Sequence, residues 1–346
     1  MAATSRSRIV TDVDFDRNGR QHGFLRLFHS VHSSAYGFIP IPIVVLKNGT
    51  GPTVLLVSGT HGDEYEGQVA LCNLVKSLDP ARIRGRVIIL PAANFPAAMA
   101  GRRTSPIDEG NLNRLFPGDP DGTITEQIAY HIEHELVPMA DLVCDLHSGG
   151  SSLMYVPSAL FGGWQRDGST AEGVAALKAF GSPVAYVAET NQGGAKTLSG
   201  GAARHGIVCL GTEAGGSGHV TRSALRMVEA AWSTCWCISA FCPRVIASRL
   251  TGRRGFWRLV VRTTSSTRQS RGCSNRWWSW ARWFARGSRR LASICRRRHG
   301  RSRSRRISRV TASCCASGSL GARCGAIVCS IWERTLRCSP DACCAA

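Results

Sequence analysis

All of the excess positive charge in this 346-residue chain lies after residue 230. Residues 1–230 carry 19 Lys and Arg against 21 Asp and Glu, whereas residues 231–346 carry 24 Arg, no Lys and two acids. Twelve of the 15 cysteines and eight of the nine tryptophans also follow residue 230. The second part shows neither helical nor strand periodicity. We therefore expect residues 1–230 to form the folded domain and residues 231–346 to be disordered or misfolded.

The last third has the composition of a wrong reading frame. If each codon starts one base earlier, Trp and Cys codons become codons for Leu, Val or Met. Residues 231–242, AWSTCWCISAFC, then read GLVNVLVHLGVL, which continues the helical pattern before them. Residues 272–288 become GLFEPLVELGEVVRAGQ, an alternating pattern with glycine turns that is typical of a β-domain. Some changes are forced, such as Trp236 to Leu, so we predict a frameshift near residue 230.

A rival interpretation assumes that the arginines are truly encoded by the gene. The run RRRHGRSRSRRISR at residues 296–309 could bind phosphates, which would make the chain an Arg-rich nucleic-acid-binding protein. That interpretation depends entirely on residues 231–346. Because residues 1–230 are close to neutral, we expect no nucleic-acid partner for the first part.

Short apolar runs rich in β-branched residues alternate with helical patterns in the first part. The runs read as buried strands. They lie at residues 53–58, 86–90, 142–147, 184–187 and 207–210. Helices are expected at 64–78 and at 124–137, the second with a capping box from Thr123 to Glu126. This alternation predicts an α/β fold with a mixed, mostly parallel sheet and helices on both faces.

Polar motifs follow three of these strands, at the sheet edge where α/β proteins bind ligands. His61 and Glu64 form H-x-x-E on a turn that runs into a helix, and His147 ends another strand. Two imidazoles and a carboxylate, with one position left open for water, are the donor set of a catalytic zinc site. Asp145, two residues before His147, would orient a ligand imidazole or would be a solvated strand-end acid.

Further candidates surround this set. Glu213, in LGTEAGGSG after another strand, is the expected general base toward water. The long segment 94–119 supplies Arg103, a cation for a carboxylate or an oxyanion, and Asn113 and Arg114, which can bind a carboxylate. The remaining histidines His131, His134 and His219 are expected at the surface.

The chain shows no targeting segment at its N-terminus, MAATSRSRIVTDVDF, and no stretch of 18 apolar residues. Three scattered cysteines in residues 1–230 suit a reducing compartment. We expect a cytoplasmic protein without a membrane partner; whether it forms a homo-oligomer stays open.

Four motifs in this order, GTHGDE, NLNR, DLHSGG and GTEAGGSG, resemble the succinylglutamate desuccinylase/aspartoacylase family over residues 20–230. The resemblance implies a zinc carboxypeptidase-like α/β fold with one Zn²⁺ per subunit on His61, Glu64 and His147. It also implies Glu213 as the catalytic carboxylate and Asn113 and Arg114 at the substrate carboxylate. Arg103 would polarise the carbonyl, although its spacing before NLNR varies in the family.

The expected activity is removal of an acyl group, best an acetyl group, from a small N-acyl amino acid. Two segments most resemble the branch of the family that deacetylates N-alpha-acetyl-L-2,4-diaminobutyrate in ectoine breakdown; they are GTHGDEYEGQ and GRRTSPIDEGNLNRLFPGD. Aspartoacylase or succinylglutamate desuccinylase activity is the alternative, and a peptide-cleaving carboxypeptidase a further one. If the frame is broken as predicted, the printed chain would be weakly active or inactive.

Overall fold

A computed structural model describes residues 7–32, 35–162, 169–188, 194–238 and 258–261. All of them fall within one of the two compact units of the chain. The strands are β1 Ile9–Val10, β2 Gly19–Phe28, β3 Phe38–Asn48, β4 Thr53–Ser58, β5 Gly85–Leu90, β6 Leu142–His147, β7 Ser158–Gly162, β8 Val184–Ala188, β9 Val208–Glu213 and β10 Arg258–Val261. The α-helices are α1 Tyr65–Ser77, α2 Phe95–Ala100, α3 Ile124–His131, α4 Ser169–Phe180, α5 Leu198–Arg204 and α6 Arg222–Ile238.

The strands form one ten-stranded sheet in the order β1-β2-β3-β5-β4-β6-β9-β7-β8-β10. The pairs β5–β4, β4–β6, β6–β9, β7–β8 and β8–β10 are parallel, and the remaining four are antiparallel. The prediction of a mixed, mostly parallel sheet is confirmed. The centre of the sheet, β4, is TVLLVS and is buried on both faces, as a continuous apolar run requires.

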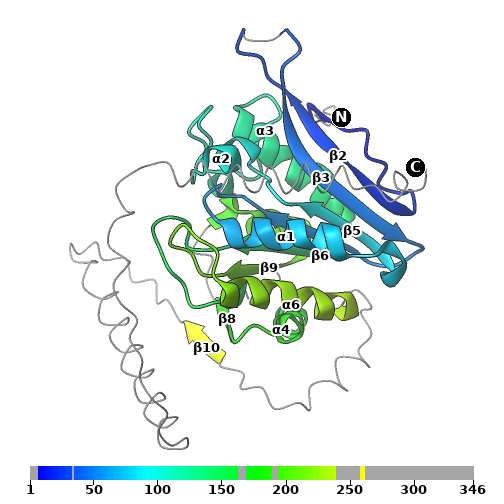
Figure 1. The fold of residues 1–346 in the computed structure, drawn as a ribbon, viewed down its shortest axis with the longest axis vertical. Coiled ribbons are helices and arrows are strands. Elements are labelled where there is room, and N and C mark those ends of the chain that lie inside the picture. The colour runs from blue at the N-terminus through cyan, green and yellow to red at the C-terminus, as the bar shows by residue number, and fades with distance from the viewer. Residues whose placement is uncertain (1–6, 33–34, 163–168, 189–193, 239–257, 262–346) are drawn as a thin grey trace, which may run out of the picture. The chain divides into compact units, whose positions relative to one another are not determined.

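Helices cover both faces of the sheet, as predicted (Figure 1). Alternate residues of β4 separate two apolar cores. Val54 and Leu56 face the core that α1, α4 and α6 complete, whereas Leu55 and Val57 face the core that α3 and α5 complete. Helices α1 and α6 lie side by side on the first face (Figure 1). The sheet is therefore buried between two layers of helices.

The second predicted helix is shorter than expected. Helix α3 begins at the capping box of Thr123 and Glu126, which is confirmed, but ends at His131. A π-helical turn, Ile132–Leu136, and a 3-10 turn, Val137–Met139, follow it. Apolar periodicity alone does not distinguish these wider and tighter turns from an α-helix, because Ile132 and Leu136 still face the core.

One histidine was placed wrongly from the sequence. His131 is buried, with 7% of its surface exposed, whereas His134 and His219 are exposed as expected. The N-terminal segment lies over this end of α3, where the Ser7 hydroxyl contacts His131 Nδ1 at 2.9 Å. A segment so far away in the sequence leaves no signal in the helical pattern.

Most of residues 231–346, including the arginine-rich run, lies outside the described residues. The described exceptions are 231–238, the last turns of α6, and β10, which pairs in parallel with β8. Helix α6 therefore crosses the boundary expected at residue 230. Within the part of the chain that the structure describes, no helix is long and apolar enough to cross a membrane.

Candidate metal centre

Three neighbouring parallel strands bring the predicted site residues to one edge of the sheet. His147 is the last residue of β6, and its partner in the register of β9 is Glu213, the last residue of that strand. On the other side of β6 lies β4, which ends at Ser58, opposite Leu146. The turn that carries His61 and Glu64 follows β4 directly and ends where α1 begins. The sheet register therefore places all four side chains together.

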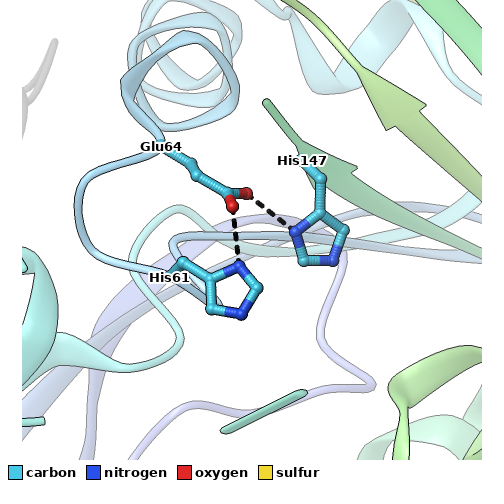
Figure 2. A group of neighbouring side chains, drawn as sticks. All are labelled: His61, Glu64 and His147. Carbon is cyan, nitrogen blue, oxygen red and sulfur yellow. Dashed lines mark hydrogen bonds and ion pairs between the residues drawn. The ribbon is translucent and has the colours of Figure 1, made fainter. Parts of the chain in front are cut away.

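His61, Glu64 and His147 face one another (Figure 2). Glu64 Oε1 lies 2.7 Å from His61 Nδ1, and Glu64 Oε2 lies 2.8 Å from His147 Nδ1. Each residue offers one ligand atom, and these three atoms lie within 4.8 Å of one another. Only 3% of His61 and of Glu64 is exposed. The three residues predicted as ligands are thus brought together.

This donor set fits a metal ion. Two imidazole nitrogens and one carboxylate oxygen are a donor set that zinc takes in catalytic sites. The carboxylate is almost fully removed from water, and its buried negative charge needs a positive partner. The set therefore forms a candidate metal site, in agreement with the prediction from the sequence.

A further polar side chain contacts the Nε2 atom of each imidazole. His147 Nε2 lies 2.9 Å from Asp145 Oδ2, and His61 Nε2 lies 3.0 Å from Asn111 Oδ1. Such contacts fix the orientation of a ligand imidazole and the nitrogen that carries its proton. Asp145 is only 4% exposed and also accepts a hydrogen bond from the Thr60 hydroxyl. The alternative of a solvated strand-end acid is therefore wrong.

The buried charges shift each other's protonation. Burial raises the pKa of Glu64, but the His147 and His61 imidazoles outweigh it and hold that pKa well below its usual range. Burial lowers the pKa of His147, yet the carboxylates of Asp145 and Glu64 raise it well above the usual imidazole value. A divalent cation among these groups would replace the His147 proton as the positive partner of Glu64.

Glu213 faces this group from β9. Burial is the main reason that its pKa rises to about 8; the charges of Glu64 and Asp145 add to it, whereas those of His147 and Arg103 oppose it. Its Oε2 atom is buried and accepts no hydrogen bond from the described residues. A carboxyl group poised near neutral pH with one oxygen unengaged suits proton transfer.

The predicted substrate-binding residues come from the segment 94–119, but only part of them reaches the ligand group. The exposed Arg103 donates from Nη1 to Glu64 Oε1 at 3.2 Å. Asn113 lies between two elements: its Nδ2 is 3.3 Å from His147 Nε2, and its Oδ1 accepts from the Leu198 peptide N–H at 3.2 Å. Arg114 is exposed and donates to the Asn113 carbonyl at 2.6 Å.

Two polar residues at this end of the sheet lie within the motifs but were not predicted from the sequence as site residues. Asn111, the first residue of NLNR, contacts His61, and Asp63, within GTHGDE, binds the loop after β6. Their motifs marked the right loops. What the sequence lacks is the distance between loops, which only the sheet register supplies.

Comparisons with known proteins agree with this geometry. The profile of the family described as the succinylglutamate desuccinylase/aspartoacylase catalytic domain matches residues 50–236. A curated relative, the N-alpha-acetyl-L-2,4-diaminobutyric acid deacetylase of Halomonas elongata, is 47% identical over 224 residues. That alignment covers 64% of this chain and 65% of the relative, so this chain matches less than two thirds of the relative's length.

Two solved structures are also similar to this chain. The product-bound ectoine utilization protein EutE of Ruegeria pomeroyi matches with a TM-score of 0.67 and 40% identity, over 75% of this chain and 77% of that one. A succinylglutamate desuccinylase of Silicibacter sp. TM1040 matches with a TM-score of 0.66 and 38% identity, over 68% and 72% of the two chains. The family match at residues 50–236 includes His61, Glu64, His147 and Glu213.

Proposed function

The chain belongs to the succinylglutamate desuccinylase/aspartoacylase family, and on this premise we propose that it is a zinc-dependent amidohydrolase that deacetylates N-alpha-acetyl-L-2,4-diaminobutyrate. The observation that carries the proposal is the convergence of His61, Glu64 and His147 beside Glu213 at the carboxyl ends of β6, β4 and β9. The 47% identity to the deacetylase of Halomonas elongata supports the choice of substrate.

His61, Glu64 and His147 would hold one zinc ion per subunit. When bound, the ion would supply a Lewis acid that polarises the amide carbonyl and makes a water molecule more acidic. Asp145 and Asn111 would accept hydrogen bonds from the protonated Nε2 atoms of His147 and His61. In this tautomer each Nδ1 atom keeps a lone pair for the ion.

Glu213 acts as the proton carrier. Its carboxylate takes a proton from the attacking water, whose oxygen forms the new bond to the carbonyl carbon. The same proton then passes to the amide nitrogen as the carbon–nitrogen bond breaks, so the products are acetate and the free diamino acid. Burial raises the pKa of Glu213 to about 8, which favours the acid form that returns the proton to the nitrogen, whereas a cation beside the group would favour the carboxylate that accepts it.

The arginines orient the substrate. Arg103, beside Glu64 at the exposed side of the site, donates toward the oxyanion that develops on the carbonyl. Arg114 takes the substrate carboxylate, assisted by Asn113. Because a protonated His147 Nε2 donates to Asp145 and cannot also accept from Asn113, the Nδ2 protons of Asn113 are available to the substrate.

A panel of three amides tests the proposal: N-alpha-acetyl-L-2,4-diaminobutyrate, N-acetyl-aspartate and N-succinyl-glutamate, each with and without added zinc. The expected result is the highest kcat/KM for the diaminobutyrate substrate, with activity lost on chelation. A preference for either of the other two would keep the deacylase reaction and change its substrate. Hydrolysis of none of them by a zinc-loaded chain in the restored reading frame would refute the enzymatic function.

A further inference from the structure

Asp63 lies inside the metal-binding turn, between His61 and Glu64, but belongs to a different set of contacts. It is 5% exposed, and its Oδ2 accepts two hydrogen bonds from Ser151, one from the peptide N–H and one from the hydroxyl, both at 2.8 Å. Gly150, with φ of +54°, packs so closely that a Cβ there would lie 2.7 Å from the same oxygen. The carboxylate thus fastens the turn after β4 to the loop after β6.

The loop that Asp63 holds starts at His147 and connects to the rest of the site. Its Gly149 N–H donates to Gly215 O at 3.0 Å, and the Gly218 N–H donates to Gly150 O at 2.8 Å. Gly215 and Gly218 follow Glu213, so the loop after β6 is bonded to the loop after β9 as well. Asp63 is therefore one end of a chain of contacts that spans all three loops of the site.

Other polar contacts between the turn 61–64 and the loop 147–151, among the described residues, use the Glu64 carboxylate. His147 Nδ1 and the Ser148 N–H both lie near Glu64 Oε2, at 2.8 and 3.1 Å. These oxygens are the atoms that a metal ion would engage. The Asp63–Ser151 contact uses none of the candidate ligand atoms, so binding of an ion would not displace it.

We propose that Asp63 is a positioning residue: it sets the spacing between the His61–Glu64 turn and the His147 loop and so keeps the three ligand atoms close enough for one ion. This inference rests on the metal site of the proposed function. Since metal affinity depends on how closely the ligands are already arranged, removal of the carboxylate should weaken binding of the ion itself.

The experiment measures the affinity of the full chain for Zn²⁺ by competition with a chromogenic chelator, without substrate. Asp63→Ala should bind Zn²⁺ at least about tenfold more weakly than the unaltered chain. Asp63→Asn should retain most of the affinity, because an amide oxygen can still accept both hydrogen bonds from Ser151. Ser151→Ala, an exposed position that loses only the hydroxyl, should lie between them.

A matched control lies at the other end of the same two strands. Asp141 Oδ2 accepts the Thr53 N–H at 2.7 Å and so joins the beginnings of β6 and β4. Asp141→Ala removes a similar contact far along both strands from the ligands, and should cost stability without weakening Zn²⁺ binding. Thermal unfolding of each metal-free variant gives its stability independently of its affinity.

The outcomes separate this inference from the proposed function. Equal Zn²⁺ affinities of Asp63→Ala and the unaltered chain, or an equal loss in Asp141→Ala, would overturn the positioning role. A loss in Asp63→Asn as large as in Asp63→Ala would also overturn it, because the charge and not the contact would then matter. If the unaltered chain binds Zn²⁺ but hydrolyses no amide, only the proposed function fails; if it binds no Zn²⁺, both fail.

Discussion

We propose that Glu213 carries the proton and is not a metal ligand. Its Oε2 accepts no hydrogen bond from the described residues and its pKa is raised, whereas the three candidate ligand atoms belong to other residues. We expect Glu213→Gln to lower kcat by about 10² to 10⁴-fold, since the amide cannot accept the water proton. The zinc content of the purified variant should equal that of the unaltered chain.

Two results would contradict this assignment. Loss of zinc in Glu213→Gln would make Glu213 a ligand, and full activity would remove it from the reaction. His61→Ala is the matched comparison, because it should lose both zinc and activity. Measuring metal content and kcat on the same preparations separates the two roles.

His131 ties the stability of the fold to pH. Burial lowers its pKa from 6.5 to about 4. The unfolded chain therefore takes up this proton below pH 6.5, while the folded chain does so only near pH 4. The contribution of His131 to the free energy of unfolding is complete above pH 6.5 and falls as the pH is lowered from 6.5 to 4, by about 3 kcal/mol in all.

Urea unfolding at several pH values checks this. The chain with His131→Gln, which cannot titrate, should lose less stability between pH 6.5 and pH 4 than the unaltered chain. His134→Gln, an exposed position in the next turn, serves as the control and should follow the unaltered chain. Parallel pH profiles for His131→Gln and the unaltered chain would show that His131 is protonated freely in the folded state.

At the scale of single residues, the sequence predicted the candidate ligands better than the residues that hold those ligands in place. His61, Glu64 and His147 stand in short motifs at strand ends, and their chemistry alone marks them. Asn111, Asp63 and the burial of His131 depend on contacts between segments far apart in the chain. Local pattern carries no information about such contacts, so these features appear only in the structure.

Among the elements, α1 must lie close to the sheet because Glu64 precedes it. Gly67 allows this approach: a Cβ there would lie 2.7 Å from Leu146 Cβ and 3.0 Å from Ser58 Cβ. Gly67→Ala should therefore push α1 away from β6 and β4 and destabilise the fold by about 1 to 3 kcal/mol, despite the better helix propensity of Ala.

Chemical denaturation measures this cost, and Zn²⁺ affinity should fall with it because Glu64 moves with the helix. Lys76→Ala, an exposed substitution on the same helix, is the control and should change neither quantity much. A stable Gly67→Ala chain with unchanged Zn²⁺ affinity would mean that α1 does not need this contact.

The central strands could be predicted, whereas of the strands farther out only β8 was expected from the sequence. Strands β4, β6 and β9 each contain a run of at least three apolar residues, which is typical of a buried parallel strand. Strand β3 contains Pro40 and Pro42, residues that argue against a strand inside a sheet. Both prolines precede Val44, where pairing with β5 begins, so they lie where β3 pairs only with β2. The sequence shows the prolines but not this register.

For the whole molecule, the reading frame of residues 231–346 decides how much of the protein is available for catalysis. We expect a chain with the frame restored near residue 230 to hydrolyse the diaminobutyrate amide faster than the printed chain. The reason is that the restored residues read as an amphipathic helix and a β-domain, and the relatives match this chain over only part of their length.

Resequencing of the gene and a side-by-side assay of the two chains test this expectation. Equal kcat/KM values for both chains would show that residues 231–346 do not matter for the reaction. An unbroken frame in the gene, together with RNA binding that is lost when residues 239–346 are deleted, would favour the arginine-rich interpretation instead.

The order of the strands has a consequence for how the protein folds. The central strands β4, β6 and β9 are neighbours in the sheet, although α1, β5, α2 and α3 separate the first two in the sequence and β7, α4, β8 and α5 separate the last two. To pair such strands the chain must close long loops, and it loses conformational entropy before the compensating contacts have formed. The pairing is therefore slow. The candidate ligand Glu64 follows β4, and the candidate ligand His147 ends β6. An ion held by both residues would therefore favour the chains that have already paired β6 with β4.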